Sequence, residues 1–173
     1  GFVVGPCMNA SGRLDTAEIT LELLLTKREP QASILAAKLV ELNEERKKMT
    51  EQNLNQAIEQ IQMKGWDQDK VMVVFLPDCH ESIAGIIAGR LRERYYRPVF
   101  VLTRGEEAIK GSGRSIEGYS MFEEMVKVSE LFLKFGGHPL AAGCSLLEEN
   151  VTTLREQLNQ LCVYRVLLNC KGL

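Results

Sequence analysis

Features that would point to several classes of function are scarce in this chain of 173 residues. Only two histidines occur, 58 positions apart, and the five cysteines form no Cys-x-x-Cys motif. This usage argues against a zinc site and a disulfide framework, and a reducing cytoplasm is the simplest environment for it. No apolar run approaches the roughly 20 residues that cross a bilayer, so no membrane partner is expected. Aromatic residues make up 6% of the chain, which leaves little material for stacking on bases.

Charge and carboxylates also narrow the possibilities. The net charge is −2, which argues against a broad surface for nucleic acid but is compatible with a local basic site. Metal-dependent phosphodiester cleavage requires carboxylates and usually histidines that together hold one or two cations. Asp67 and Asp69 are separated by one residue, but no histidine lies near them in the sequence. We therefore predict a solvated loop there and no metal-binding residue in this chain.

Residues 31–64 contain neither glycine nor proline, which predicts a helix of 34 residues, roughly 50 Å long. Its two ends carry apolar positions, whereas the stretch from Asn43 to Asn53 has only Met49. This pattern is typical of a helix that bridges two packed bodies. One long surface helix of a single domain is the alternative. Before it we expect a short strand and a glycine-rich turn in residues 1–14, and then a helix that ends near Thr26.

After Gly65, apolar β-rich segments alternate with helical patterns. Strands are predicted at 71–76 and 99–103, with a helix at 82–94 between them. A strand–helix–strand unit implies a right-handed crossover and parallel strands. Further strands are expected at 110–115 and 141–147, and further helices at 120–129 and 149–161. The predicted fold class is α/β, with a mixed, mostly parallel sheet flanked by helices and preceded by the long helix.

Two glycine-rich motifs lie between residues 105 and 143, where seven of the 14 glycines occur. Gly111-Ser112-Gly113-Arg114-Ser115 has the components of a phosphate site: backbone N–H groups, hydroxyl donors and a guanidinium fork. Gly136-Gly137-His138 places a histidine beside backbone that a ligand can approach closely. The structural alternatives are a solvated hairpin for the first motif and a tight turn between a helix and a strand for the second.

Two further positions have weaker signals. Asn9-Ala10-Ser11-Gly12-Arg13 offers an amide and an arginine for a ligand, or else forms a helix-entry turn. His80 directly precedes a predicted helix, where it would contact an anion or simply cap the helix. No complete active site is found among these residues.

The order of the motifs is more specific than any motif alone. Six segments follow one another along the chain: Asn9–Arg13, the long helix, His80–Leu91, Arg97-Pro98, Lys110–Ser115 and Phe135–Gly143. From residue 1 to about 161 this series resembles the RecJ-type exonucleases of the DHH phosphoesterase family. Members of that family have an N-terminal domain whose Asp-His-His signature binds two Mn²⁺ or Mg²⁺ ions. A long helix joins it to a DHH-associated domain, and RecJ-type members degrade single-stranded DNA from the 5′ end.

The resemblance implies a division of the chain and a role for each motif. Residues 1–28 would end the catalytic domain, residues 29–64 would form the connecting helix, and residues 65–173 would form the DHH-associated substrate-binding domain. Phosphate would be held by Ser112, Arg114 and Ser115. The metal cleft would be faced by Gly136, Gly137 and a catalytic His138. Asn9 and Arg13 would line the cleft from the other side, and His80 would lie at its rim. The implied partners are single-stranded DNA, the N-terminal DHH domain of the same protein and, as a further candidate, a single-strand-binding protein.

The chain also departs from the family pattern. The metal-binding signature is absent, so Mn²⁺ or Mg²⁺ would bind the N-terminal domain, and this piece alone is expected to hold no cofactor and to be inactive. Cys79 replaces an aromatic residue that usually precedes His80, and residues 162–173 match no known pattern. A nanoRNase or cyclic-dinucleotide phosphodiesterase of the same family is the first alternative, although its linker is generally shorter. A non-catalytic nucleic-acid-binding module, as in some tRNA synthetases, is the second.

Overall fold

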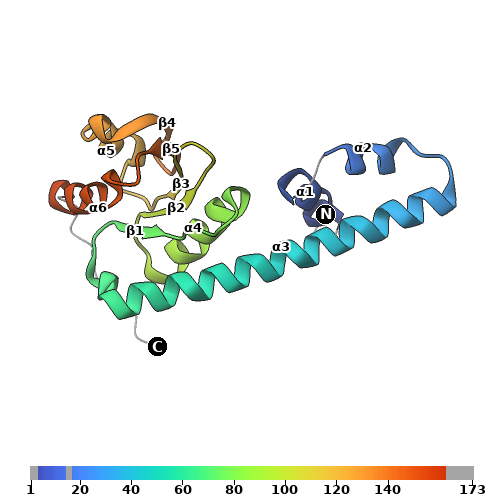
Figure 1. Cartoon of the computed structure of the whole chain (residues 1–173), viewed down its shortest axis with the longest axis horizontal. Helices are drawn as coiled ribbons and strands as arrows, with labels where there is room; N and C mark the ends of the chain where they lie inside the picture. Colours follow the sequence, from blue (N-terminus) through green and yellow to red (C-terminus); the bar gives the residue numbers. More distant parts are fainter. Residues whose placement is uncertain (1–3, 15–16, 163–173) are drawn as a thin grey trace. The chain divides into compact units, whose positions relative to one another are not determined.

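The computed structural model describes residues 4–14 and 17–162, in two compact units divided between Asn53 and Leu54. The division lies within α3 (Glu29–Lys64), a helix of 36 residues that confirms the predicted long helix (Figure 1). Gly65 ends it with a φ of 66°, a left-handed conformation that glycine adopts without strain. None of the helices in the described ranges is long and apolar enough to cross a membrane.

The first unit pairs two short helices with the beginning of α3. α1 (Val4–Leu14) and α2 (Glu18–Leu25) pack around buried Cys7, Ile19 and Leu39. The strand and glycine-rich turn predicted for residues 1–14 are wrong for residues 4–14, which are helical. Pro6 lies in the first turn of α1, where its missing N–H removes no helical hydrogen bond, and the burial of Ala10 and Ser11 offsets the cost of the nearby glycines. The predicted end of α2 near Thr26 is confirmed.

The second unit contains a five-stranded sheet in the order β1-β2-β3-β5-β4. Only β1 and β2 are parallel, joined through α4 (Glu81–Tyr95); the other three pairings are antiparallel. The α/β class and the flanking helices are confirmed, but the expectation of a mostly parallel sheet is wrong. The loops after β2 and after β4 are too short for a crossover, so each closes an antiparallel hairpin. The strands are β1 (Met72–Phe75), β2 (Val99–Arg104), β3 (Ile109–Arg114), β4 (Phe132–His138) and β5 (Ala141–Leu146).

Helices cover the two faces of this sheet differently. α4 packs against β2 and β3 on one face. The other face packs against α5 (Met121–Val126) and α6 (Asn150–Leu161), on the far side of the sheet from α4 in Figure 1. A single helix predicted over 120–129 is instead α5 followed by a 3-10 turn at Ser129–Leu131.

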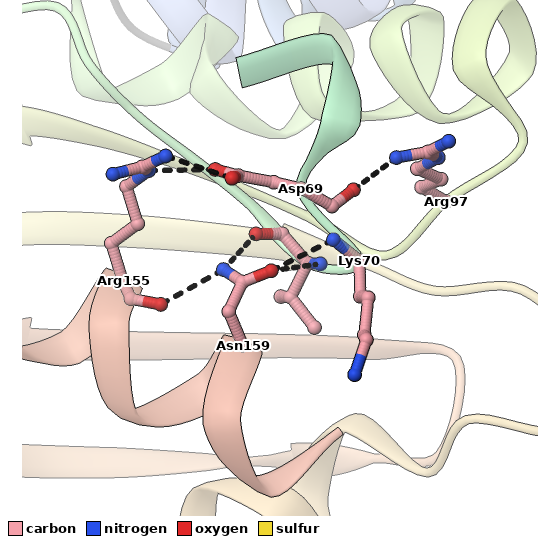
Figure 2. A network of polar contacts seen from close by, with 6 residues as sticks. Asp69, Lys70, Arg97, Arg155 and Asn159 are labelled. Carbon is pink, nitrogen blue, oxygen red and sulfur yellow. Dashed lines mark hydrogen bonds and ion pairs between the residues drawn. The ribbon is translucent and has the colours of Figure 1, made fainter. Parts of the chain in front are cut away.

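A polar network closes the sheet edge beside β1. The side chain of Asn159 accepts hydrogen bonds from Lys70 N at 2.7 Å and Val71 N at 3.1 Å, and donates to Val71 O at 2.8 Å (Figure 2). One turn earlier on α6, Arg155 binds the Asp69 carboxylate with two nitrogens, at 2.6 and 2.8 Å. The solvated loop predicted at Asp69 is therefore wrong, because this carboxylate is a largely buried part of the fold.

Candidate phosphate-binding site

The two glycine-rich motifs lie on strands separated only by β5. Equivalent residues of β3, β5 and β4 form rows across the sheet. Neighbouring rows on one face are about 7 Å apart along a strand, and neighbouring strands are about 4.8 Å apart. Residues more than 20 positions apart in the sequence thereby become neighbours. The three rows on one face are Lys110–Ser145–Lys134, Ser112–Gly143–Gly136 and Arg114–Ala141–His138.

These rows share a face because side chains at alternate strand positions point the same way. The intervening residue Gly113 belongs to the opposite, packed face, where an added Cβ would lie 2.2 Å from the sulfur of Met121. Over β5 and β4 the rows are exposed at Gly143, Gly136 and His138. We call this surface of β3, β5 and β4 the open face. It carries four predicted site residues: Ser112, Arg114, Gly136 and His138.

The paired glycines have different roles. Gly137 has a φ of 153°, and a Cβ there would lie 2.4 Å from the carbonyl oxygen of Ala141, so the hairpin requires glycine at this position. An added Cβ at Gly136 would meet nothing within 4 Å. The fold therefore does not require glycine at position 136 for steric reasons. A ligand that approaches the backbone of the open face would require it, because a side chain there would stand in its way.

His138 is the last residue of β4 and is exposed. Its Nδ1 accepts a weak hydrogen bond of 3.4 Å from Leu140 N in the two-residue turn that leads to β5. Because Nδ1 accepts, the neutral ring carries its proton on Nε2, which is then the donor available to a ligand. The turn is part of a β-hairpin, and the alternative of a turn between a helix and a strand is wrong.

A groove of about 330 Å³ lies between the first turns of α4 and the open face. Ser82 from α4 and Lys110, Ser112 and Gly143 from the sheet are among its lining residues. A larger hollow of about 710 Å³ shares Lys110 and Glu81 with this groove and is also lined by His80. Lys110 and Lys134 were not predicted as site residues. Their signal in the sequence is alternation, since each lies two residues before a predicted site residue on its strand.

His80 caps α4. Its Nδ1 accepts a hydrogen bond of 3.3 Å from Ser82 N and lies 2.7 Å from the Ser82 hydroxyl. The capping role considered from the sequence is thus present, and it leaves Nε2 as the ring donor. Since His80 lines the hollow that adjoins the groove, the cap also places the ring on the same side of the second unit as Ser112.

Ser115 does not fit its predicted phosphate contact. It is buried, and its hydroxyl donates a hydrogen bond of 2.7 Å to Tyr119 O. Its backbone N–H also bonds internally, to Leu140 O at 2.8 Å. Ser115 therefore fixes the loop after β3 and joins it to the turn beside His138.

Arg114 ends β3 and lies against α4. Its Nη1 donates to Gly113 O at 2.7 Å, and its guanidinium approaches Gly85 of α4. Ala84, Gly85, Ala88 and Gly89 are small residues of this helix, and small residues allow a neighbour to approach closely. At Gly85 that neighbour is the predicted phosphate-binding arginine.

Asn9 and Arg13 lie four residues apart on α1, so they share one face of that helix, and both are exposed. The helix-entry turn considered for them is replaced by the helix itself. Both residues belong to the first compact unit, whereas the open face and its groove lie wholly in the second.

Thiol and metal chemistry find little support in the described residues. Burial raises the pKa of Cys79 to about 11 and that of Cys144 to about 12, so neither is a thiolate near neutral pH. Across residues 4–14 and 17–162, no group of three or more histidines, cysteines or carboxylates is arranged to hold a metal ion. The open face itself carries the cationic side chains of Lys110, Arg114 and Lys134.

Comparison with known proteins gives a consistent result. A family model described as the DHHA1 domain matches residues 68–163. The single-stranded-DNA-specific exonuclease RecJ of Bacillus subtilis is 39% identical over 163 residues, which cover 93% of this chain and 21% of that protein. RecJ of Escherichia coli is 34% identical over 169 residues, with 93% and 29% covered.

The fold agrees with these matches. A crystal structure of RecJ with Mn²⁺ from Thermus thermophilus superimposes with a TM-score of 0.83 and 32% identity, covering 92% of this chain and 23% of that one. The chain thus spans only about a fifth to three tenths of the length of these curated relatives. The resemblance inferred from the motif order is confirmed: the chain belongs to the DHHA1 domain family and is similar in sequence and fold to RecJ exonucleases.

Proposed function

We propose that this chain is the C-terminal, substrate-binding portion of a RecJ-type exonuclease that digests single-stranded DNA in the 5′→3′ direction. The open face carries the proposal, because strand register gathers Ser112, Arg114, Gly136 and His138 on it. A hydroxyl, a guanidinium, an imidazole N–H and a bare backbone all suit phosphate oxygens. The relatives named as single-stranded-DNA-specific exonucleases supply the polymer to which that phosphate would belong.

Each residue has a role in this proposal. Arg114 and Ser112 bind phosphate oxygens, and Gly136 lets the backbone approach them. His138, at the tip of the hairpin, donates its Nε2–H to the phosphate that reacts and is the catalytic residue of this chain. His80 lies at the rim and contacts the strand farther along.

The first unit fits the end of a larger catalytic domain, as proposed for residues 1–28. Exposed large apolar side chains are frequent there, which suits a surface that continues into more protein. Residues 29–64 would be the connecting helix, residues 65–173 the DHH-associated domain, and Asn9 and Arg13 would face the substrate from the catalytic side. The exposed apolar residues of the first unit are Val4, Leu21, Leu24, Leu25, Ile34 and Val40.

The metal ions of the proposed reaction would bind outside this chain. Two structures of the Thermus relative hold Mg²⁺ and Mn²⁺, and the described residues here contain no group of three or more candidate metal ligands. We infer that an N-terminal DHH domain of the same protein holds Mn²⁺ or Mg²⁺, which activates the attacking water. The chain alone should be inactive and should bind single-stranded DNA weakly and in a salt-sensitive manner. A single-strand-binding protein and a cytoplasmic location also belong to the proposal.

The test uses the full-length gene product with Mn²⁺ and single-stranded DNA that carries a 5′ phosphate and a label at either end. The expected result is release of a 5′ label as mononucleotide at the earliest times, while a 3′ label stays on long products. Activity confined to dinucleotides would favour the nanoRNase or cyclic-dinucleotide alternative. Binding of DNA without hydrolysis would favour a non-catalytic module.

A further inference from the structure

We infer that Gly85 is a positioning residue for Arg114: the side chain it lacks leaves the space that the guanidinium occupies. A Cβ added at Gly85 would lie 2.7 Å from Nη2 of Arg114, 3.4 Å from Cζ and 3.6 Å from Nη1. All three of its nearest neighbours thus belong to one guanidinium group. The inference rests on the proposed function, because Arg114 is there a phosphate ligand.

Glycine is an unfavourable choice at this position for the helix itself. Gly85 lies inside α4, where glycine is less favourable for the helix than alanine. Its neighbours Ile83, Ala84, Ile87 and Ala88 are buried, so the helix is held firmly against the sheet on both sides of it. A conformational need of the backbone does not explain the residue either, because Gly85 is not among the glycines with positive φ.

The second restraint on Arg114 comes from its own strand, through the bond of 2.7 Å from Nη1 to Gly113 O. A free arginine side chain has many rotamers, and the binding of a ligand would otherwise have to restrict them. A guanidinium held between Gly113 O and the surface of α4 is already ordered before phosphate arrives. Preorganised donors of this kind lower the cost of binding and keep the fork in the orientation that the phosphate requires.

Close packing of helix and sheet is the competing explanation. It would place backbone or core side chains near the missing Cβ, and the nearest atoms are instead the tip of a flexible side chain. A Cβ at residue 85 can therefore be accommodated by displacing the guanidinium rather than the helix. Gly89, one turn later on the same side of α4, meets nothing within 4 Å and offers a matched control.

The experiment compares Gly85→Ala and Gly89→Ala in the full-length protein on 5′-phosphorylated single-stranded DNA. Both variants should unfold at equal or higher denaturant concentration than the parent, since alanine favours the helix. Gly85→Ala should lower kcat/KM by about 10- to 100-fold, because small displacements of positioning groups have effects of this size. Gly89→Ala should leave kcat/KM unchanged.

A double-mutant cycle with Arg114→Ala separates the possible causes. Once Arg114 is removed, Gly85→Ala should have no further effect on kcat/KM. An equal loss in both backgrounds would show that Gly85 acts through helix packing and would overturn the inference. Loss with Arg114→Ala but none with Gly85→Ala would also overturn it, yet leave the proposed phosphate role intact. Full activity of Arg114→Ala would overturn both.

Discussion

The two edges of the sheet use polar residues in opposite ways. Beside β1, Asn159 occupies both the N–H and the C=O of Val71, and Arg155 binds both oxygens of Asp69. At the other edge, β4 ends in Gly136, Gly137 and His138, which are all exposed. At the β1 edge the polar side chains bind other groups of the protein. At the β4 edge, glycine backbone and a histidine are exposed, with lysine and arginine side chains nearby.

This difference separates polar residues that hold the fold from those available to a ligand. The carboxylate of Asp69 was expected in a solvated loop, but its two oxygens are bonded to Arg155. Ser115 looked like a phosphate ligand, but its hydroxyl is bonded to Tyr119 O. In both cases residue type alone did not reveal the internal partner that the polar group binds.

The largest effect is expected from Arg114→Ala in the full-length protein. Loss of a preorganised charged donor should lower kcat/KM on single-stranded DNA by about 10²- to 10³-fold. DNA affinity should fall far less, because other contacts persist. Steady-state kinetics and equilibrium binding on the same variant measure the two effects. Equal losses in turnover and affinity would contradict a role in the reaction.

Arg155→Ala should destabilise the β1 edge of the sheet and leave the residues of the open face in place. The Asp69 carboxylate would lose a two-nitrogen partner while its side chain is only 15% exposed, at a cost of about 1–3 kcal/mol of unfolding free energy. Urea unfolding of the full-length protein measures this change, with kcat/KM at low temperature expected to stay near the parent value. The control is Arg104→Ala at the exposed pair with Glu148, which should change stability by well under 1 kcal/mol.

The paired glycines Gly136 and Gly137 allow a structural role and a ligand-binding role to be compared within one hairpin. Gly137→Ala should lower unfolding free energy by about 1–3 kcal/mol, since alanine would be strained at this φ and would collide with Ala141 O. Gly136→Ala should leave stability unchanged and lower kcat/KM by about tenfold, because a methyl group would stand where a phosphate approaches. Denaturant unfolding and kinetics should therefore rank the two variants in opposite orders. Unchanged activity of a stable Gly136→Ala protein would remove Gly136 from the site.

The smallest effect is expected from Lys134→Ala on the open face. A lysine that contacts one phosphate should contribute about one unit to the slope of log affinity against log salt concentration. Titrations of single-stranded DNA at several salt concentrations measure that slope in the full-length protein. Lys127→Ala removes the same charge from the segment just after α5 and should leave the slope unaltered. A similar change in both variants would show that net charge, not position, determines binding.

Much of the fold could be predicted from local pattern. The unbroken stretch from residue 31 to 64 predicted α3, and the apolar segments around α4 predicted the parallel pair β1 and β2. The misassigned segments had no such pattern. α1 contains Gly5, Pro6 and Gly12, so its sequence suggests a turn, and burial in the first unit overrides that preference. The antiparallel pairings were missed because they depend on short connections whose strand ends the sequence did not define sharply.

By itself the sequence determined the set and order of the motifs, and through them the family, because these are properties of residue type and spacing. Only the tertiary structure decided which motif residues face a ligand. The pairing of β3, β5 and β4 places Ser112, Gly136 and His138 on one surface, and a shift by one residue would have turned each to the packed side. The contact of Arg114 with Gly85 likewise joins a strand end to a helix, through a distance that no local pattern encodes.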